Sequence, residues 1–317
     1  MAGAVNPVPM GCPTFLDVPR CTDLSALAAH VAVIGVPFGT PYDLYRSSLA
    51  SVAPEAIRQQ SLFFTPRYRG HYDFDFGGDL FAGRTVKIVD CGDVAMAPGR
   101  WEENCRGTTA AIQTILDRGA VPIALGGEDS TPIPVLRAYE GRGPICIVQV
   151  DAHIDWRDEL GGIRQGLSST MRRASEMPWV SGMVQIGIRG FGSARRAEFD
   201  DARTYGSVLI GAQEVHGAGV DEVLRRLPPA DGYYITVDAD GLDPTIAPAV
   251  QAPAFGGLTY YEAANLLRGV AAKGKIAGFD LVEVMPSADL NGMTSRLAAQ
   301  LILILIGAMC HTGQLGV

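Results

Sequence analysis

The stretch QVDAHIDWRD, residues 149–158, places Asp151, His153 and Asp155 at alternate positions directly after an apolar run. In an extended chain, alternate side chains point to the same side, so we expect two carboxylates and one imidazole to converge. These groups are common ligands of divalent metal ions. The pattern therefore indicates a metal site, although capping and loop hydrogen bonds are the alternative explanation for one short motif.

A second motif, TVDADGLDP at residues 236–244, repeats this spacing with Asp238 and Asp240. Carboxylates at short range repel one another and raise each other's pKa, and divalent cations between them relieve that repulsion. Four carboxylates with further ligands are too many for one tetrahedral zinc ion but suit two adjacent ions that share bridging oxygens. Oxygen-rich ligation favours manganese, whereas the order of affinities alone favours nickel. Such a pair lowers the pKa of a water between the ions and supplies a hydroxide nucleophile.

Eight short apolar runs, rich in β-branched residues, carry these motifs at their ends. Runs of this kind form strands that are covered on both faces of a sheet. Segments with helical spacing lie between them, and this alternation predicts an α/β fold in which a parallel sheet of about eight strands is sandwiched between helices. The runs span residues 31–36, 85–92, 121–125, 144–150, 184–190, 207–211, 233–237 and 276–284.

Helical spacing is clearest at residues 105–119, 219–227 and 259–274, where Thr259 is an N-cap candidate and Gly274 a stop signal. No linker divides the chain, so we predict an N-terminal arm, residues 1–30, and a single domain, residues 31–317. Residues 63–84 lack periodicity, and we expect them to cover the surface or contact a neighbouring subunit.

Acidic residues follow several of the predicted strands. In open α/β sheets, ligands bind at the carboxyl ends of the strands. We therefore expect these acids to lie along one rim of the sheet: Asp90, Asp93, Glu128, Asp129, Asp151, Asp155, Asp238, Asp240 and Glu283.

The composition, 47% hydrophobic and 19% charged, is that of a soluble globular protein. A net charge of -8 without basic runs disfavours binding to nucleic acid or to an anionic membrane, and a cationic substrate is easier to accommodate.

Six scattered cysteines indicate buried thiols in a reducing cytoplasm. The N-terminal residues do not resemble a signal peptide. The apolar run 301–309 is too short to span a bilayer, and we expect it inside a terminal core helix.

Other motifs have simpler explanations. Cys91 and Cys146 lie in or beside predicted strands and are expected in the core. The glycines of GIRGFG, residues 187–192, are in the wrong order for a dinucleotide fingerprint. Asp243 precedes a proline and indicates a turn.

Three segments resemble, in order and spacing, the signatures of the ureohydrolases, which include arginase, agmatinase and guanidinobutyrase. They are DAHID at 151–155, TVDADGLDPTIAPAVQAPAFGGL at 236–258, and LVEVMP at 281–286. The resemblance implies a three-layer α/β/α sandwich, assembly into trimers or hexamers, and hydrolysis of a guanidino carbon with release of urea. It also implies two manganese ions, or nickel in a branch that acts on guanidine.

The resemblance also implies a role for each matching residue. Asp151 and Asp238 are expected to bridge the two metal ions, with Asp155 completing the shell of the first ion and His153 with Asp240 that of the second. Asp155 is expected to act as the catalytic proton acceptor. Glu283 matches the acid that orients the guanidinium, and a carboxylate pairs well with that planar cation.

This chain departs from the family pattern at three places that bear on its activity. Where the family has Gly-Gly-Asp-His-Ser, this chain has GGEDS at 126–130, so Asp129 replaces a metal-binding histidine and is itself expected to bind metal. Residues 156–177 contain no histidine, although arginase-like relatives have one there that is associated with proton transfer. The family's Arg-Pro-Gly-Ala-Arg pattern survives only as scattered residues within 35–58.

Two functions follow. The first is a metal-dependent hydrolase of agmatine, guanidinobutyrate, guanidine or a substituted guanidine, as in metformin hydrolase, which resembles this family. The second is a structural or regulatory subunit that has lost turnover and assembles with an active related chain in a hetero-oligomer, because related chains can inherit a common interface.

Overall fold

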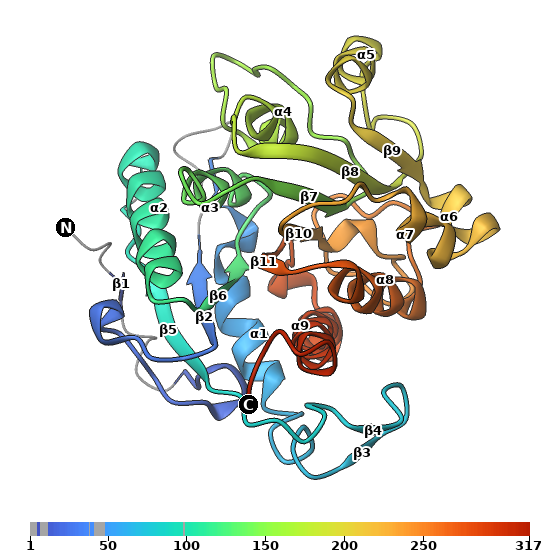
Figure 1. The fold of residues 1–317 in the computed structure, drawn as a ribbon. Helices are drawn as coiled ribbons and strands as arrows, with labels where there is room; N and C mark the ends of the chain where they lie inside the picture. The colour runs from blue at the N-terminus through green and yellow to red at the C-terminus, as the bar shows by residue number, and fades with distance from the viewer. Residues whose placement is uncertain (1–4, 7–11, 38, 41–47, 98) are drawn as a thin grey trace.

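The computed structural model describes residues 5–6, 12–37, 39–40, 48–97 and 99–317. Within these residues, nine strands form one sheet in the order β1-β5-β2-β6-β11-β10-β7-β8-β9 (Figure 1). The eight strands from β5 to β9 in this order are parallel, and the short β1 pairs antiparallel with β5 at one edge. The predicted parallel sheet is confirmed, with β1 as an unpredicted addition.

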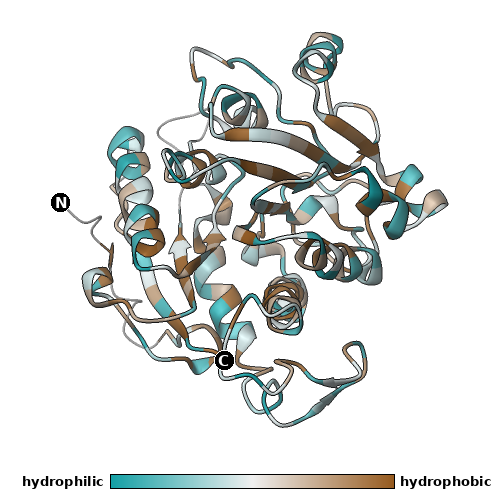
Figure 2. Cartoon of the chain, viewed as in Figure 1, coloured by the Kyte–Doolittle hydropathy of each residue, from teal (hydrophilic) through white to brown (hydrophobic). Residues whose placement is uncertain are grey.

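The strands of the main sheet are mostly apolar, as the brown segments in Figure 2 show. Every residue of β2, β7 and β10 is buried, because helices cover both faces of the sheet. The strand bounds are β1 Val5–Asn6, β2 Val31–Val36, β5 Ile88–Val94, β6 Val121–Gly126, β7 Ile145–Val150, β8 Val180–Ile188, β9 Val208–Gly211, β10 Tyr233–Asp238 and β11 Ile276–Val282.

Helices form a layer on each face of the sheet, which confirms the three-layer sandwich (Figure 1). One apolar cluster joins the sheet to the first layer: α1 Ala53–Ser61, α6 Ala212–Ala218, α7 Val220–Arg226, α8 Tyr260–Lys273 and α9 Met293–His311. A second cluster joins it to the other layer: α2 Trp101–Asp117, α3 Pro132–Arg137, α4 Thr170–Ser175 and α5 Arg196–Tyr205.

The predicted helices occur close to their expected positions, as α2, α7 and α8. Thr259 caps α8 as predicted, since its hydroxyl accepts from the backbone N–H of Glu262 and the Glu262 carboxylate accepts from that of Thr259. The run 301–309 lies inside α9, which by length and composition alone could cross a membrane. Most of that helix is buried in the core, so it packs as the predicted terminal core helix.

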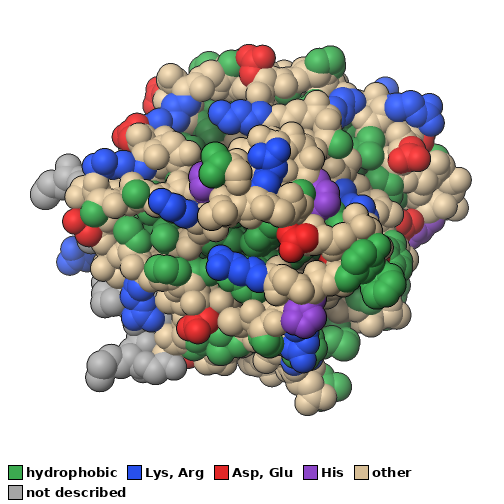
Figure 3. Space-filling view, turned by 60° about the horizontal axis from the view of Figure 1, so that its bottom comes forward, with side chains coloured by type: hydrophobic (Ala, Val, Ile, Leu, Met, Phe, Trp, Pro, Cys, Tyr) green, Lys and Arg blue, Asp and Glu red, His purple; other side chains and the backbone are tan. Residues whose placement is uncertain are grey.

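Residues 63–84 are irregular apart from a short hairpin of β3 Tyr72–Asp73 and β4 Gly78–Asp79 (Figure 1). Of the predicted N-terminal arm, residues 1–4 and 7–11 lie outside the described residues. Further along it, Phe15 and Leu16 are buried in the core beside α1. On the face shown in Figure 3, Lys and Arg side chains are interspersed with acidic and apolar ones.

Candidate metal centre

Four strands that are neighbours in the sheet deliver the predicted site residues. In the order β6-β11-β10-β7, they are followed by Asp129, Glu283, the Asp238–Asp240 segment and the Asp151–Asp155 segment. Because the strands are parallel, their carboxyl ends meet at one edge. All of these acids are buried, and the predicted convergence of aspartates from distant parts of the chain is therefore present.

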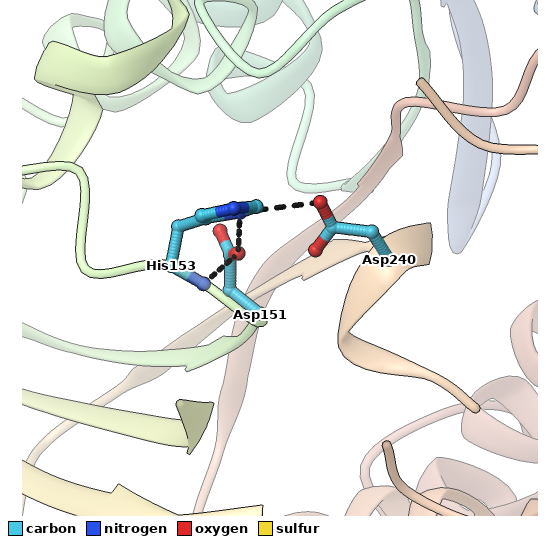
Figure 4. Close-up of side chains that lie close together, drawn as sticks. All are labelled: Asp151, His153 and Asp240. Atoms are coloured by element: carbon cyan, nitrogen blue, oxygen red, sulfur yellow. Dashed lines mark hydrogen bonds and ion pairs between the residues drawn. The ribbon is translucent and has the colours of Figure 1, made fainter. Parts of the chain in front are cut away.

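Asp151, His153 and Asp240 form the first group of candidate ligands (Figure 4). The Nδ1 atom of His153 lies 3.3 Å from Oδ1 of Asp151 and 3.2 Å from Oδ2 of Asp240. One ligand atom from each residue lies within 4.8 Å of the others, a spacing that one cation can bridge. The imidazole and two carboxylates are thus positioned to hold a divalent ion.

Asp129, Asp151 and Asp238 form a second group with the same spacing. Both carboxylate oxygens of Asp129 are buried and have no hydrogen-bond partner among the described residues. A buried carboxylate without a partner must either take up a proton or be accompanied by a cation. The residues present therefore fit two divalent ions, and Asp151, which belongs to both groups, is placed to bridge them.

Asp155 and Glu283 line the same cavity, which has a volume of about 180 Å³. Oε1 of Glu283 accepts a hydrogen bond from the backbone N–H of Asp129 at 2.8 Å, and its buried Oε2 has no partner among the residues described. Both residues have left-handed backbones, with φ of 49° at Asp155 and 65° at Glu283. Such strain in non-glycine residues is typical of functional sites.

The side chains after β7 converge because the loop turns, and the prediction that the chain stays extended there is wrong. The backbone N–H of His153 donates to Oδ1 of Asp151 at 2.6 Å, and the positive φ of Asp155 reverses the chain. The loop after β10 lies against this turn. A Cβ atom at Gly241 would come within 2.6 Å of the backbone nitrogen of Asp151, so only glycine permits this close approach.

Burial and mutual repulsion raise the pKa values of the cluster. The pKa values of Asp129, Asp151 and Asp238 are raised well above the ordinary range, first by loss of solvent and then by neighbouring carboxylates. Burial likewise raises the pKa of Glu283 to about 8. The hydrogen bond to Asp240 raises the pKa of His153. Cations in the cluster would oppose these shifts for the carboxylates.

Three of the acids expected at this rim, Asp90, Asp93 and Glu128, lie outside both ligand groups and have other partners. The fully buried guanidinium of Arg58 binds Asp90 at 2.8 Å and Asp93 at 2.6 Å, so these carboxylates neutralise a structural cation. Glu128 is buried next to Asp129, but its Oε1 accepts from the Ser130 hydroxyl and it belongs to neither ligand group. Their positions relative to the predicted strands did not distinguish these acids from the candidate metal ligands.

Comparisons with known proteins agree with this geometry. Residues 29–307 match the Arginase family. The chain is 31% identical to the guanidinobutyrase of Pseudomonas aeruginosa, covering 92% of this chain and 90% of the relative. It is 33% identical to the mitochondrial agmatinase of Gallus gallus, over 93% and 84% of the two chains. The solved structure of proclavaminate amidinohydrolase from Streptomyces clavuligerus superposes with a TM-score of 0.82 at 30% identity, covering 95% of this chain and 97% of that one.

The chain belongs to the arginase family. Members of this family are binuclear metal hydrolases, which agrees with two ligand groups that share Asp151. Asp129, which the resemblance implies in place of a family histidine, lies in one of the two ligand groups. The scattered family pattern within 35–58 lies partly outside the described residues, at 38 and 41–47.

Two residues of this arginase-family site were not anticipated. Gln149, in β7, donates from Nε2 to Asp151 and to Asp155, and a glutamine in an otherwise apolar strand was the available signal. Arg189, from the GIRGFG motif, donates to backbone carbonyls that include those of Asp240 at 2.6 Å and Ala254 at 2.7 Å. It therefore ties down the loop that carries Asp240, a role that depends on tertiary contacts.

Proposed function

We propose that this chain hydrolyses a small guanidino compound to urea, or a urea-like product, and an amine. The observation that carries the proposal is the shared Asp151, because it joins two ligand groups whose other members line one cavity together with Glu283. Relatives named guanidinobutyrase, agmatinase and guanidinopropionase support a guanidino substrate.

Each side chain has a distinct task in this reaction. The free Oε2 of Glu283 accepts an N–H of the substrate guanidinium and holds its central carbon above the aspartates. Two divalent ions, when bound, polarise water and lower its pKa. Asp155 accepts a proton as the water oxygen bonds to the carbon. The carbon–nitrogen bond then breaks, and the proton passes to the departing amine.

We propose Mn²⁺ or Ni²⁺ as the ions. One ligand group contains only carboxylates, and hard oxygen ligands favour Mn²⁺. The other group contains His153, and an imidazole also suits Ni²⁺. Asp129 adds a negative charge where the family has a neutral histidine, which strengthens cation binding and makes bound water less acidic.

The cavity favours a small substrate. Its volume of about 180 Å³ is below the roughly 300–1,000 Å³ of pockets that hold drug-sized ligands. Among the described residues that line it, Arg157 alone carries a permanent positive charge, and its Nε binds Glu198 at 3.2 Å. The remaining guanidinium nitrogens of Arg157 can pair with the carboxylate of a guanidino acid such as 4-guanidinobutyrate.

The second candidate function is that of a subunit without turnover, assembled with an active related chain. A specific feature favours it: among the described lining residues His153 is the sole imidazole, so the site has fewer proton-transfer groups than the family pattern implies.

In either case we propose an oligomer, a homotrimer or homohexamer for the enzyme, located in the cytoplasm. The six cysteines are all free, in keeping with a reducing compartment.

One experiment separates the two candidates. The purified chain is loaded with Mn²⁺ or Ni²⁺, and metal per subunit is measured together with urea release from 4-guanidinobutyrate, agmatine and guanidine. Dimethylbiguanide is assayed by the appearance of dimethylamine. Two ions per chain with turnover support the enzyme. Turnover that appears only with a co-expressed relative supports the subunit.

A further inference from the structure

Gln149 joins two carboxylates of the metal centre. It lies in β7, two residues before Asp151, with only 1% of its surface exposed. Its Nε2 atom donates to Oδ2 of Asp151 at 2.7 Å and to Oδ2 of Asp155 at 2.8 Å. Both protons of one amide are therefore used on two like-charged groups, and the amide holds them together without adding charge.

The orientation of this amide matters because its two ends are opposite in character. Turned by 180°, Gln149 would direct its carbonyl oxygen at the carboxylates, and the contacts would become repulsive. Its Oε1 atom accepts from Nε2 of Gln185, a second buried amide on β8, at 2.5 Å. The orientation of Gln149 thus depends on that of Gln185.

Gln185 is held in one orientation by two partners, each of which can play only one hydrogen-bonding role. The indole N–H of Trp156 can only donate, and it lies 2.7 Å from Oε1 of Gln185. The backbone carbonyl of Ile154 can only accept, and it lies 2.8 Å from Nε2 of the same amide. The Ser207 hydroxyl also donates to Oε1, at 3.0 Å. The Nε2 end of Gln185 must therefore face Gln149.

We propose that Gln149 is a positioning residue of the metal centre and that Trp156, acting through Gln185, sets the direction of its amide. The proposal rests on the proposed metal-dependent function. In this arrangement the indole of Trp156, which can only donate, orients the amide of Gln185, and Gln185 in turn orients the amide of Gln149. Asp151 and Asp155 therefore keep fixed positions. Substitution of a residue that hydrogen-bonds to a metal ligand commonly lowers metal affinity by about 10–100-fold.

The test measures Mn²⁺ affinity by calorimetry before any substrate is added. Gln149→Met conserves volume but removes both donors, and we expect Mn²⁺ binding about 10–100-fold weaker. Trp156→Phe removes the donor that orients Gln185, and we expect a smaller weakening. Trp179→Phe is the matched control, because its indole donates to the carbonyl of Leu136, outside the network, and its affinity should equal that of the wild type.

The double variant Gln149→Met/Trp156→Phe decides whether Trp156 acts through Gln149. If it does, the double variant binds Mn²⁺ no more weakly than Gln149→Met alone. Losses that multiply, or wild-type affinity in Gln149→Met, would overturn the proposal while leaving the proposed function intact. Thermal unfolding of each variant in EDTA checks that the fold is retained. A wild-type chain that binds Mn²⁺ but has no turnover contradicts the proposed hydrolase and leaves the role of Gln149 standing. A wild-type chain that binds neither Mn²⁺ nor Ni²⁺ overturns both proposals.

Discussion

The backbone N–H of Asp129 donates to Oε1 of Glu283 at 2.8 Å, so the loops after β6 and β11 are tied together inside the cavity. This bond leaves Oε2 of Glu283 free for a substrate. It also fixes the acid that we propose to bind the guanidinium relative to the segment that carries Asp129. The proposed substrate and metal sites therefore share one hydrogen bond.

Glu283→Gln retains an acceptor for the Asp129 N–H but removes the charge that pairs with a guanidinium. We expect kcat/KM to fall by about 100-fold or more, since an interaction with the reacting group is lost, while metal content stays unchanged. Steady-state kinetics and metal analysis of the same preparation check this. Unchanged kcat/KM would remove Glu283 from the substrate site.

Asp129 is tested by two substitutions with opposite expectations. Asp129→Asn removes one negative charge from a ligand group whose other members are Asp151 and Asp238, so we expect the metal content to drop toward one ion per chain. Asp129→His restores the family's ligand type, and we expect two ions and a higher rate. A metal content in Asp129→Asn equal to that of the wild type, together with an unchanged rate in Asp129→His, would show that this position does not bind metal.

Arg157 is expected to recognise the tail of the substrate. Arg157→Met should reduce kcat/KM for 4-guanidinobutyrate by about 10-fold or more, because a charge-assisted pair is worth about 1.5–3 kcal/mol. Guanidine has no tail, and its kcat/KM should change little, which makes it the internal control. Equal losses for both compounds would assign Arg157 a structural role at the cavity wall.

Arg58 is expected to stabilise the fold rather than to assist the reaction. Its guanidinium is fully buried against Asp90 and Asp93, and Arg58→Met leaves both acids without their partner. Breaking a buried ion pair typically costs about 3–5 kcal/mol of unfolding free energy. The control is Arg100→Met, which removes an exposed pair with Glu103 and should cost less than about 1 kcal/mol. Urea denaturation of both variants provides the measurement.

Asp280 should make stability depend on pH. It is fully buried in β11, and burial raises its pKa to about 7, although the Tyr234 and Thr236 hydroxyls donate to it. The folded state therefore holds this proton more tightly than the unfolded state, whose Asp pKa is about 3.9. Its contribution to stability is complete below pH 4, is lost as the pH rises toward 7, and is constant above that.

Asparagine cannot titrate, so Asp280→Asn should not lose stability in this way as the pH rises. The melting temperature of the variant, minus that of the wild type at the same metal concentration, should increase from pH 4 to pH 7 and then level off. A difference that stays flat across this range would contradict a raised pKa at Asp280.

The local elements of this protein were predictable because they depend on neighbouring residues. Apolar runs form the eight parallel strands, and the predicted N-cap residue Thr259 does cap α8. The motif residues Asp151 and Asp238 were found because each directly follows a predicted apolar run. The sequence by itself thus determined the fold class, the edge of the sheet where the candidate ligands lie and most of the candidate metal-binding acids.

Tertiary structure decided which polar residues share a contact. Asp90 and Asp151 both accompany buried strands, yet one neutralises Arg58 and the other joins two ligand groups. The link between Gln149 and Trp156 runs through Gln185, 36 residues beyond Gln149 in the chain. Hydrogen bonds and ion pairs act over about 3 Å in space, and no periodicity along the chain records which distant side chains the folded backbone brings that close.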